Sequence, residues 1–313
     1  MRAALLAKLA ERMRADRSVY VLTADTGFHV FDEFQQEFSD RYLNVGISEA
    51  AMIGVAAGLA LSGARVFTYG IAPFVTMRCL EQIRVDLCYA RLPVTIVGVG
   101  AGFTYGPAGV THHSLEDIAV LSALPNMTIV CPGDPAEVRA AVAALSGLDG
   151  PCYLRLGKNG EPAVHETDPS AFALGRALRL REGEDPALLA TGNMLPVAQA
   201  AADILAAQGY RPELISMHTV KPLDECVVRD LAARCRLIAT VEEHNIIGGL
   251  GSMVAGVLSE AGGMARLARF GVPDRYTTNA GSQAALRRRY GLTPERIAGE
   301  LAGRLQDGGR PTD

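Results

Sequence analysis

Three short segments in the first half of this 313-residue chain carry the residues best suited to chemistry. The first places one carboxylate, Glu49, where an extended run meets an Ala/Gly-rich helix. The second leads from Tyr69 to the aromatic ring of Phe74. The third holds two adjacent histidines, His112 and His113. Together the segments offer a carboxylic acid, an aromatic ring and an imidazole, which can orient a planar molecule and move a proton.

The position of Glu49 has a simpler explanation when the residue is taken alone. Ser48 can cap a helix, and Met52, Val55 and Leu59 follow at helical spacing. A glutamate in the first turn then interacts favourably with the positive end of the helix dipole. Only the two later segments favour a chemical role for it.

In this order and at these distances, the three segments resemble the pyrimidine-binding domain of transketolase-type thiamine diphosphate enzymes. The resemblance implies that Glu49 activates the cofactor by hydrogen bonding to its aminopyrimidine. It implies that Phe74 stacks on that ring, with Ile71 where the family usually carries a second aromatic residue. His112 would face the substrate and exchange a proton, and Asp25 would lie near the thiazolium.

Other positions bear on the substrate. Lys158 matches a family arginine that binds a substrate phosphate, and Arg155 and His29 are further candidates. Gly100 and Pro107-Ala108 stand where sugar-phosphate transketolases usually carry a histidine and acidic residues that contact donor hydroxyls. The resemblance therefore implies unchanged cofactor chemistry on a donor other than a simple sugar phosphate.

The pattern along the chain predicts an α/β fold with two doubly wound domains and mostly parallel sheets. Continuous apolar runs alternate with helical stretches, as in a sheet covered on both faces. Gly and Pro interrupt this rhythm over 161–185, so we predict a pyrimidine-binding domain at 1–160, a linker at 161–185 and a transketolase C-terminal-like domain at 186–313.

Composition excludes several classes of function. A net charge of −4 gives no basic footprint for nucleic acid. None of the six cysteines forms a CxxC pair, which favours buried thiols over metal ligands. No apolar run is long enough to span a membrane, and the charged N-terminal segment predicts an amphipathic helix. We expect a cytoplasmic protein.

The family binds the diphosphate and Mg²⁺ through a Gly-Asp-Gly motif in a separate domain, and this motif does not occur in the chain. A charged diphosphate needs a metal and donors to hold it. The resemblance covers only the second half of a complete transketolase. We therefore expect a separately encoded diphosphate-binding subunit that holds Mg²⁺, with self-association to an α2β2 assembly.

The expected function is transfer of a two-carbon ketol or acyl unit from a ketose or 2-oxo acid to an aldehyde. One alternative is the β subunit of a 2-oxo acid dehydrogenase decarboxylase, but that family has a different segment at Tyr69–Phe74. A non-catalytic scaffold subunit is the other, and retention of Glu49 argues against it.

Overall fold

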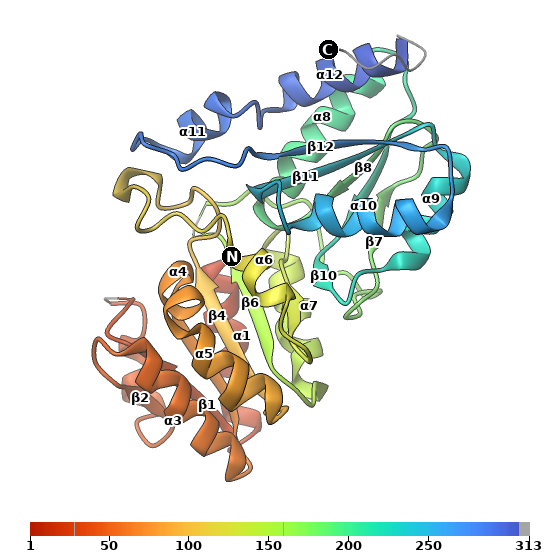
Figure 1. Cartoon of the computed structure of the whole chain (residues 1–313). Helices are drawn as coiled ribbons and strands as arrows, with labels where there is room; N and C mark the ends of the chain where they lie inside the picture. Colours follow the sequence, from red (N-terminus) through yellow and green to blue (C-terminus); the bar gives the residue numbers. More distant parts are fainter. Residues whose placement is uncertain (28, 159, 307–313) are drawn as a thin grey trace.

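The computed structural model describes residues 1–27, 29–158 and 160–306. It contains two α/β units, each built on its own sheet (Figure 1). Nearly all strand pairs are parallel, with one antiparallel pair at the edge of each sheet. The predicted fold class is therefore confirmed.

The first sheet has seven strands in the order β10-β5-β6-β4-β3-β1-β2. Six belong to the first half of the chain, and all of these except the edge strand β2 are largely buried, as expected for a sheet covered on both faces. Their bounds are β1 (Val19–Thr23), β2 (Tyr42–Asn44), β3 (Arg65–Ile71), β4 (Val94–Val99), β5 (Thr128–Val130) and β6 (Cys152–Leu156).

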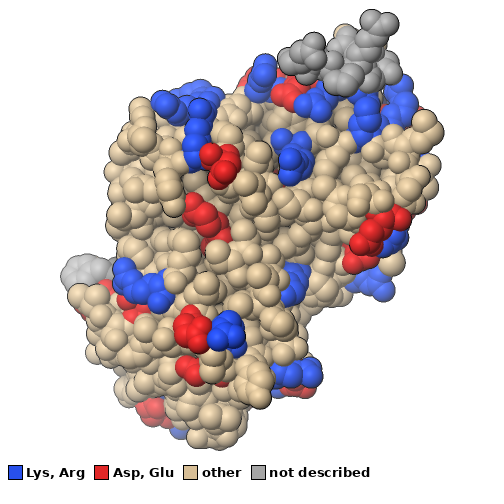
Figure 2. All heavy atoms as spheres, viewed as in Figure 1, with Lys and Arg blue, Asp and Glu red and all other residues tan. Residues whose placement is uncertain are grey.

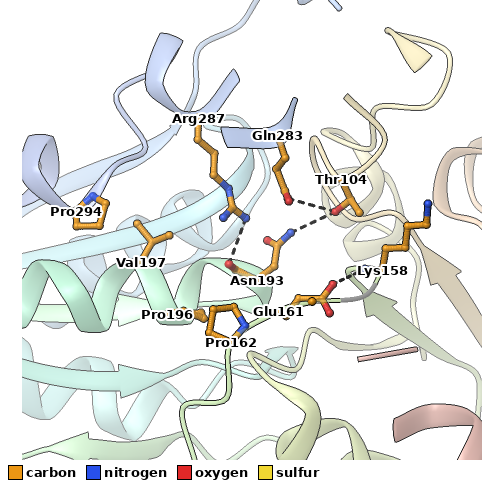
Figure 3. Close-up of a pocket in the computed structure, with 11 residues that line it drawn as sticks. Thr104, Lys158, Glu161, Pro162, Asn193, Pro196, Val197, Gln283, Arg287 and Pro294 are labelled. Carbon is orange, nitrogen blue, oxygen red and sulfur yellow. Dashed lines mark hydrogen bonds between the residues drawn. The ribbon is translucent and has the colours of Figure 1, made fainter. Parts of the chain in front are cut away.

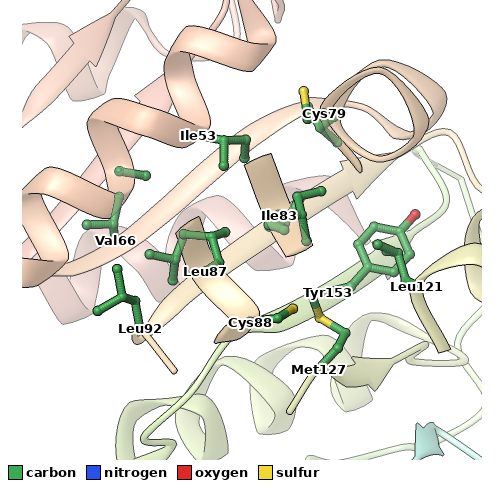
Figure 4. Close-up of a cluster of buried hydrophobic side chains, with 14 of the residues drawn as sticks. Ile53, Val66, Cys79, Ile83, Leu87, Cys88, Leu92, Leu121, Met127 and Tyr153 are labelled. Atoms are coloured by element: carbon green, nitrogen blue, oxygen red, sulfur yellow. The ribbon is translucent and has the colours of Figure 1, made fainter. Parts of the chain in front are cut away.

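Helices cover both faces of this sheet. One face packs against α1 (Arg2–Ala15), α2 (Asp32–Glu37) and α7 (Pro135–Ala144). The other face carries α3 (Glu49–Leu61), η2 (Ile83–Tyr89) and α6 (Asp117–Ser122), whose apolar side chains form the cluster in Figure 4. The helical segment before β4 is divided into α4 (Ala72–Val75), η1 (Met77–Cys79), α5 (Leu80–Gln82) and η2.

The second sheet has five strands in the order β12-β11-β8-β9-β7. These are β7 (Leu178–Arg181), β8 (Ala187–Ala190), β9 (Glu213–Ser216), β11 (Leu237–Asn245) and β12 (Arg266–Val272). Apolar residues of α8 (Leu195–Ala207) and α12 (Pro294–Gln306) pack on one face, and those of α9 (Glu225–Arg234) and α10 (Leu250–Ala261) pack on the other. α11 (Gln283–Arg289) precedes α12.

Two short strands depart from the expected domain plan. β7 lies inside the predicted linker at 161–185 and pairs antiparallel with β9. β10 (Thr219–Lys221) comes from the second half of the chain but pairs with β5 of the first sheet. The two units therefore share backbone hydrogen bonds, and the domain limits remain a prediction.

All six cysteines lie among the described residues as free thiols, and only Cys226 is exposed. Within the described ranges, no helix is both long and apolar enough to cross a membrane.

Candidate active site

The candidate residues gather at the carboxyl edge of the first sheet. Asp25 follows β1, Glu49 follows β2, Phe74 follows β3 and Lys158 follows β6. Carboxyl ends of parallel strands lie at one edge, and ligands of open α/β sheets bind in the crevice outside that edge. The chain also reverses its direction of strand addition between β1 and β3, which is where such crevices form.

Glu49 is the first residue of α3, and its side chain is only 4% exposed. Ser48 occupies the N-cap position but makes no capping hydrogen bond through its side chain. The carboxylate is instead paired with Arg78, whose Nη1 donates to Oε2 at 2.7 Å. Arg78 was not among the site residues predicted from the sequence.

Phe74 and His112 complete the group. The Arg78 guanidinium lies 4.5 Å from the centre of the Phe74 ring, which is close enough for a cation–π interaction. The His112 ring meets Phe74 edge-on with 5.1 Å between ring centres. Glu49, Arg78, Phe74 and His112 therefore form a continuous chain of contacts at the end of β3.

The two adjacent histidines face different surroundings, as expected. His112 is half-buried and its Nδ1 lies 2.9 Å from the Thr111 hydroxyl. His113 is buried, with Nε2 3.2 Å from the Gly106 carbonyl oxygen and its ring against Phe103. Only His112 is placed to reach a molecule bound beside Phe74.

The donor set fits an aminopyrimidine. A buried carboxylate beside an accessible aromatic ring can hydrogen bond to a heterocycle and stack on it. Arg78 makes both contacts in this structure, and its side chain is 50% exposed. It can therefore leave Glu49 and Phe74 without disturbing the core. Ile71, half-buried at the end of β3, adds an apolar wall.

Thiamine diphosphate also needs a metal ion and donors to hold its diphosphate. Among the residues the structure describes, no group of three or more His, Cys, Asp or Glu side chains could hold a metal ion. The contacts around Glu49 and Phe74 are suited to the aminopyrimidine.

Asp25 and His29 lie further along the same edge. Asp25 is tied to Asn44 by two hydrogen bonds, which link the ends of β1 and β2. His29 is exposed, and its Nδ1 lies 2.9 Å from an Asp32 carboxylate oxygen. Neither has a described contact with Glu49, Phe74 or His112, so their predicted roles rest on the resemblance alone.

Arg155 has a different environment from the one expected of a substrate ligand. It is buried in β6, where Nε donates to Asp117 at 2.7 Å and Nη2 donates to the carbonyl oxygens of Ser114 and Glu243. Burial alone would raise the pKa of Asp117, but Arg155, His244 and the Tyr153 hydroxyl outweigh it and lower that pKa. This geometry supports a structural role for Arg155 between the two units.

His244 and Glu242 lie near the same boundary between the two units. His244 is fully buried, and burial lowers its pKa to about 4, so the ring is neutral near pH 7. Burial raises the pKa of Glu242 to about 7, although this carboxylate accepts hydrogen bonds from Leu250 and Gly251 at the start of α10. Glu242 thus caps the start of α10 within the second unit, whereas His244 accepts a hydrogen bond from Ala119 N of the first unit at 3.3 Å.

Lys158 lies at the rim of a cavity of about 400 Å³ between the two units. Figure 3 shows Thr104 of the first unit facing Asn193, Gln283 and Arg287 of the second. The Lys158 ammonium lies 5.0 Å from the centre of the Tyr105 ring. The site thus extends from His112 past Tyr105 to the ammonium group of Lys158.

The face in Figure 2 carries its charges as scattered spots of both signs, with no continuous basic patch. This agrees with the net charge of −4 and gives no electrostatic footprint for nucleic acid on that face.

Comparison with known proteins decides the family. Residues 1–161 match the model of the transketolase pyrimidine binding domain, and residues 175–297 match that of the transketolase C-terminal domain. The chain belongs to the transketolase family. The resemblance stated from the three segments is therefore confirmed.

Several similar proteins are single subunits of transketolases. This chain is 38% identical over 290 residues to one subunit of an apulose-4-phosphate transketolase of Phocaeicola vulgatus, covering 92% of each chain. It is 39% identical to a 6-deoxy-6-sulfo-D-fructose transketolase subunit of a Clostridium species, covering 92% of this chain and 89% of that one. A split-gene transketolase, solved as an inactive beta4 tetramer, superposes with a TM-score of 0.87 at 35% identity and 97% coverage of both chains.

Proposed function

We propose that this chain is the pyrimidine-side subunit of a split, thiamine diphosphate-dependent transketolase. The observation that carries the proposal is the contact chain from Glu49 through Arg78 and Phe74 to His112. It provides the acid and the ring that an aminopyrimidine needs, in a chain without the Gly-Asp-Gly motif. Transketolases homologous over most of this chain are also named as separate subunits.

The residues of this chain have distinct tasks in that reaction. Glu49 hydrogen bonds to the aminopyrimidine and holds a proton there, and Phe74 fixes the ring plane. When bound, thiamine diphosphate supplies a carbon nucleophile and an electron sink for breaking a bond next to a ketone. His112 donates to the substrate oxygen on which charge develops.

In this proposal the partner subunit supplies the ligands for Mg²⁺ and the diphosphate. The surface around Glu49 supports such a partner. After Glu49, α3 has no polar side chain as far as Leu61, and Val55 on its outer face is 40% exposed. A helix that is apolar all round is normally buried. Further exposed apolar side chains in this part of the chain are Leu43, Ile47, Leu61, Met77, Val85 and Tyr89.

Val55→Arg tests this surface. A charged side chain in the middle of a desolvated contact leaves its charge unpaired, so we expect affinity for the partner subunit to fall at least about tenfold. Met264→Arg is the matched control, because Met264 is 95% exposed in the second unit. Titration calorimetry with the purified partner measures both. Equal affinity of the Val55→Arg and Met264→Arg chains would contradict the proposed face.

The donor is proposed to be a keto compound with few hydroxyl groups and an anionic end. Gly100, Pro107 and Ala108 offer no side-chain hydrogen bond to donor hydroxyls. Lys158 can meet an anion, and the two relatives above are named for phosphorylated or sulfonated sugars. Each donor hydroxyl left without a partner costs about 1–3 kcal/mol.

We expect xylulose 5-phosphate to be a poor donor for the two-subunit complex, and a smaller or less hydroxylated keto compound such as pyruvate to compete better. A donor panel with one aldehyde acceptor measures kcat/KM for each. Ordinary turnover of xylulose 5-phosphate with none of pyruvate would contradict the proposed donor class. Absence of transfer from every donor would contradict the proposed function itself.

A further inference from the structure

Tyr105 occupies the space that Gly100 leaves open. Gly100 follows β4 with φ +99°, a conformation that residues with side chains rarely adopt. A Cβ atom built on Gly100 would lie 2.3 Å from both Cδ2 and Cε2 of Tyr105. The glycine and the tyrosine ring are therefore a matched pair, because any side chain at position 100 would displace the ring.

The ring stands between the two candidate substrate residues. Its centre lies 6.2 Å from that of His112, with the planes at 68°, and 5.0 Å from the Lys158 ammonium. His112 in turn contacts Phe74. Tyr105 thus lines the site between His112 and Lys158.

The loop holds this ring in place. The Tyr105 carbonyl oxygen accepts from Ala108 N at 2.9 Å, and the neighbouring Thr104 hydroxyl donates to Ala101 O at 2.6 Å. Gly281 of the second unit donates to Gly106 O at 3.3 Å. Because hydrogen bonds hold the loop on both sides of Tyr105, its ring should exclude large ligands more strictly than a mobile side chain would.

The chemistry of the ring also selects a ligand. Burial raises the pKa of Tyr105, with Arg2 opposing part of that effect, so the hydroxyl stays protonated near neutral pH. The side chain offers one polar group and otherwise an apolar face. A long polyhydroxylated chain against that face would lose hydrogen bonds to water without replacing them.

We propose that Tyr105 is a specificity-determining residue that restricts the donor to short keto compounds whose anionic end reaches Lys158. This inference rests on the proposed function and deepens it, since it names the side chain that sets the length of the donor. Gly100 contributes to the same specificity, because the absence of a side chain at position 100 leaves room for the Tyr105 ring.

The test compares donors of different length on the two-subunit complex. Fructose 6-phosphate serves as the long donor and erythrulose 4-phosphate as the short one, and the quantity measured is the ratio of their kcat/KM values. Removing the ring in Tyr105→Ala should shift this ratio toward the long donor by about tenfold or more, the usual effect of a changed apolar pocket on substrate choice. Tyr105→Leu, which keeps more of the packing, should shift it in the same direction.

Two variants provide the controls. Tyr105→Phe keeps the ring and should leave the ratio near that of the wild type. Tyr276→Ala removes an exposed tyrosine ring from the second unit and should leave the ratio unchanged. An unchanged ratio in both Tyr105→Ala and Tyr105→Leu, with an active wild-type complex, would overturn this inference alone. Transfer from pyruvate but from neither sugar phosphate would also overturn this inference, because the short donor should be accepted. A wild-type complex that transfers nothing from either donor or from pyruvate would overturn the proposed function instead.

Discussion

Glu49→Gln should lower kcat/KM of the two-subunit complex by about 10²–10⁴-fold, the usual contribution of a positioned acid or base. The amide has nearly the shape of the acid and can still accept a hydrogen bond from Arg78. It cannot supply a shared proton to the aminopyrimidine. The loss should therefore appear in the first chemical step, while assembly with the partner stays largely intact.

Two measurements separate these effects. Exchange of the cofactor C2 proton for deuterium reports the step directly, and sedimentation reports assembly. Glu260→Gln makes the same change on an exposed residue of the second unit, 72% exposed, and should leave both readings at the wild-type level. Proton exchange at the wild-type rate in the Glu49→Gln complex would contradict the proposed role of Glu49 in activating the cofactor.

Arg155→Met should destabilise the isolated chain more strongly than any substitution at the cofactor edge of the sheet. It leaves Asp117 buried without its guanidinium partner and removes two hydrogen bonds to backbone carbonyls, one from each unit. Breaking a buried ion pair on one side typically costs about 3–5 kcal/mol. We expect urea unfolding of the isolated chain to show a loss of this size.

A second substitution provides a sharper control. In the double variant Arg155→Met, Asp117→Leu the lone buried carboxylate is gone, and replacing a whole buried pair with apolar groups is often close to neutral. Stability should therefore be partly restored. Arg17→Met, in an exposed pair with Asp40, should change little. A loss for Arg155→Met no larger than for Arg17→Met would show that the buried pair and the hydrogen bond from Arg155 to the second unit contribute little to stability.

The elements that carry the site could be predicted because their signals are local. Met52, Val55 and Leu59 follow Ser48 at helical spacing, and α3 spans Glu49–Leu61. The residues of β4 (Val94–Val99) and β6 (Cys152–Leu156) are nearly all apolar, which is typical of buried strands in a parallel sheet. Glu49, Phe74 and Lys158 therefore could be assigned to one edge of one sheet from periodicity and the order of elements.

Contacts between distant parts of the chain could not be predicted in this way. The partners of Arg155 lie 38 and 88 residues away, so nothing near position 155 distinguishes a buried ion pair from a substrate ligand. β7 and β10 are short, and their pairing is antiparallel at sheet edges. Arg78 and Tyr105 were missed because only tertiary packing brings them to Glu49 and Gly100. For Tyr105, the glycine at position 100 was the one signal available in the sequence.

Binding of thiamine diphosphate by the isolated chain, measured by calorimetry with and without Mg²⁺ and then repeated with the partner subunit, tests the central claim most directly. In the proposed function the chain provides Glu49 and Phe74 for the aminopyrimidine, and the partner provides the ligands for the metal and the diphosphate. Among the described residues of the chain, no group of three or more His, Cys, Asp or Glu side chains could hold a metal ion. We expect weak, Mg²⁺-independent binding and no ketol transfer by the chain alone, and tight, Mg²⁺-dependent binding with the partner. Submicromolar, Mg²⁺-dependent binding by the isolated chain would contradict the split-site account.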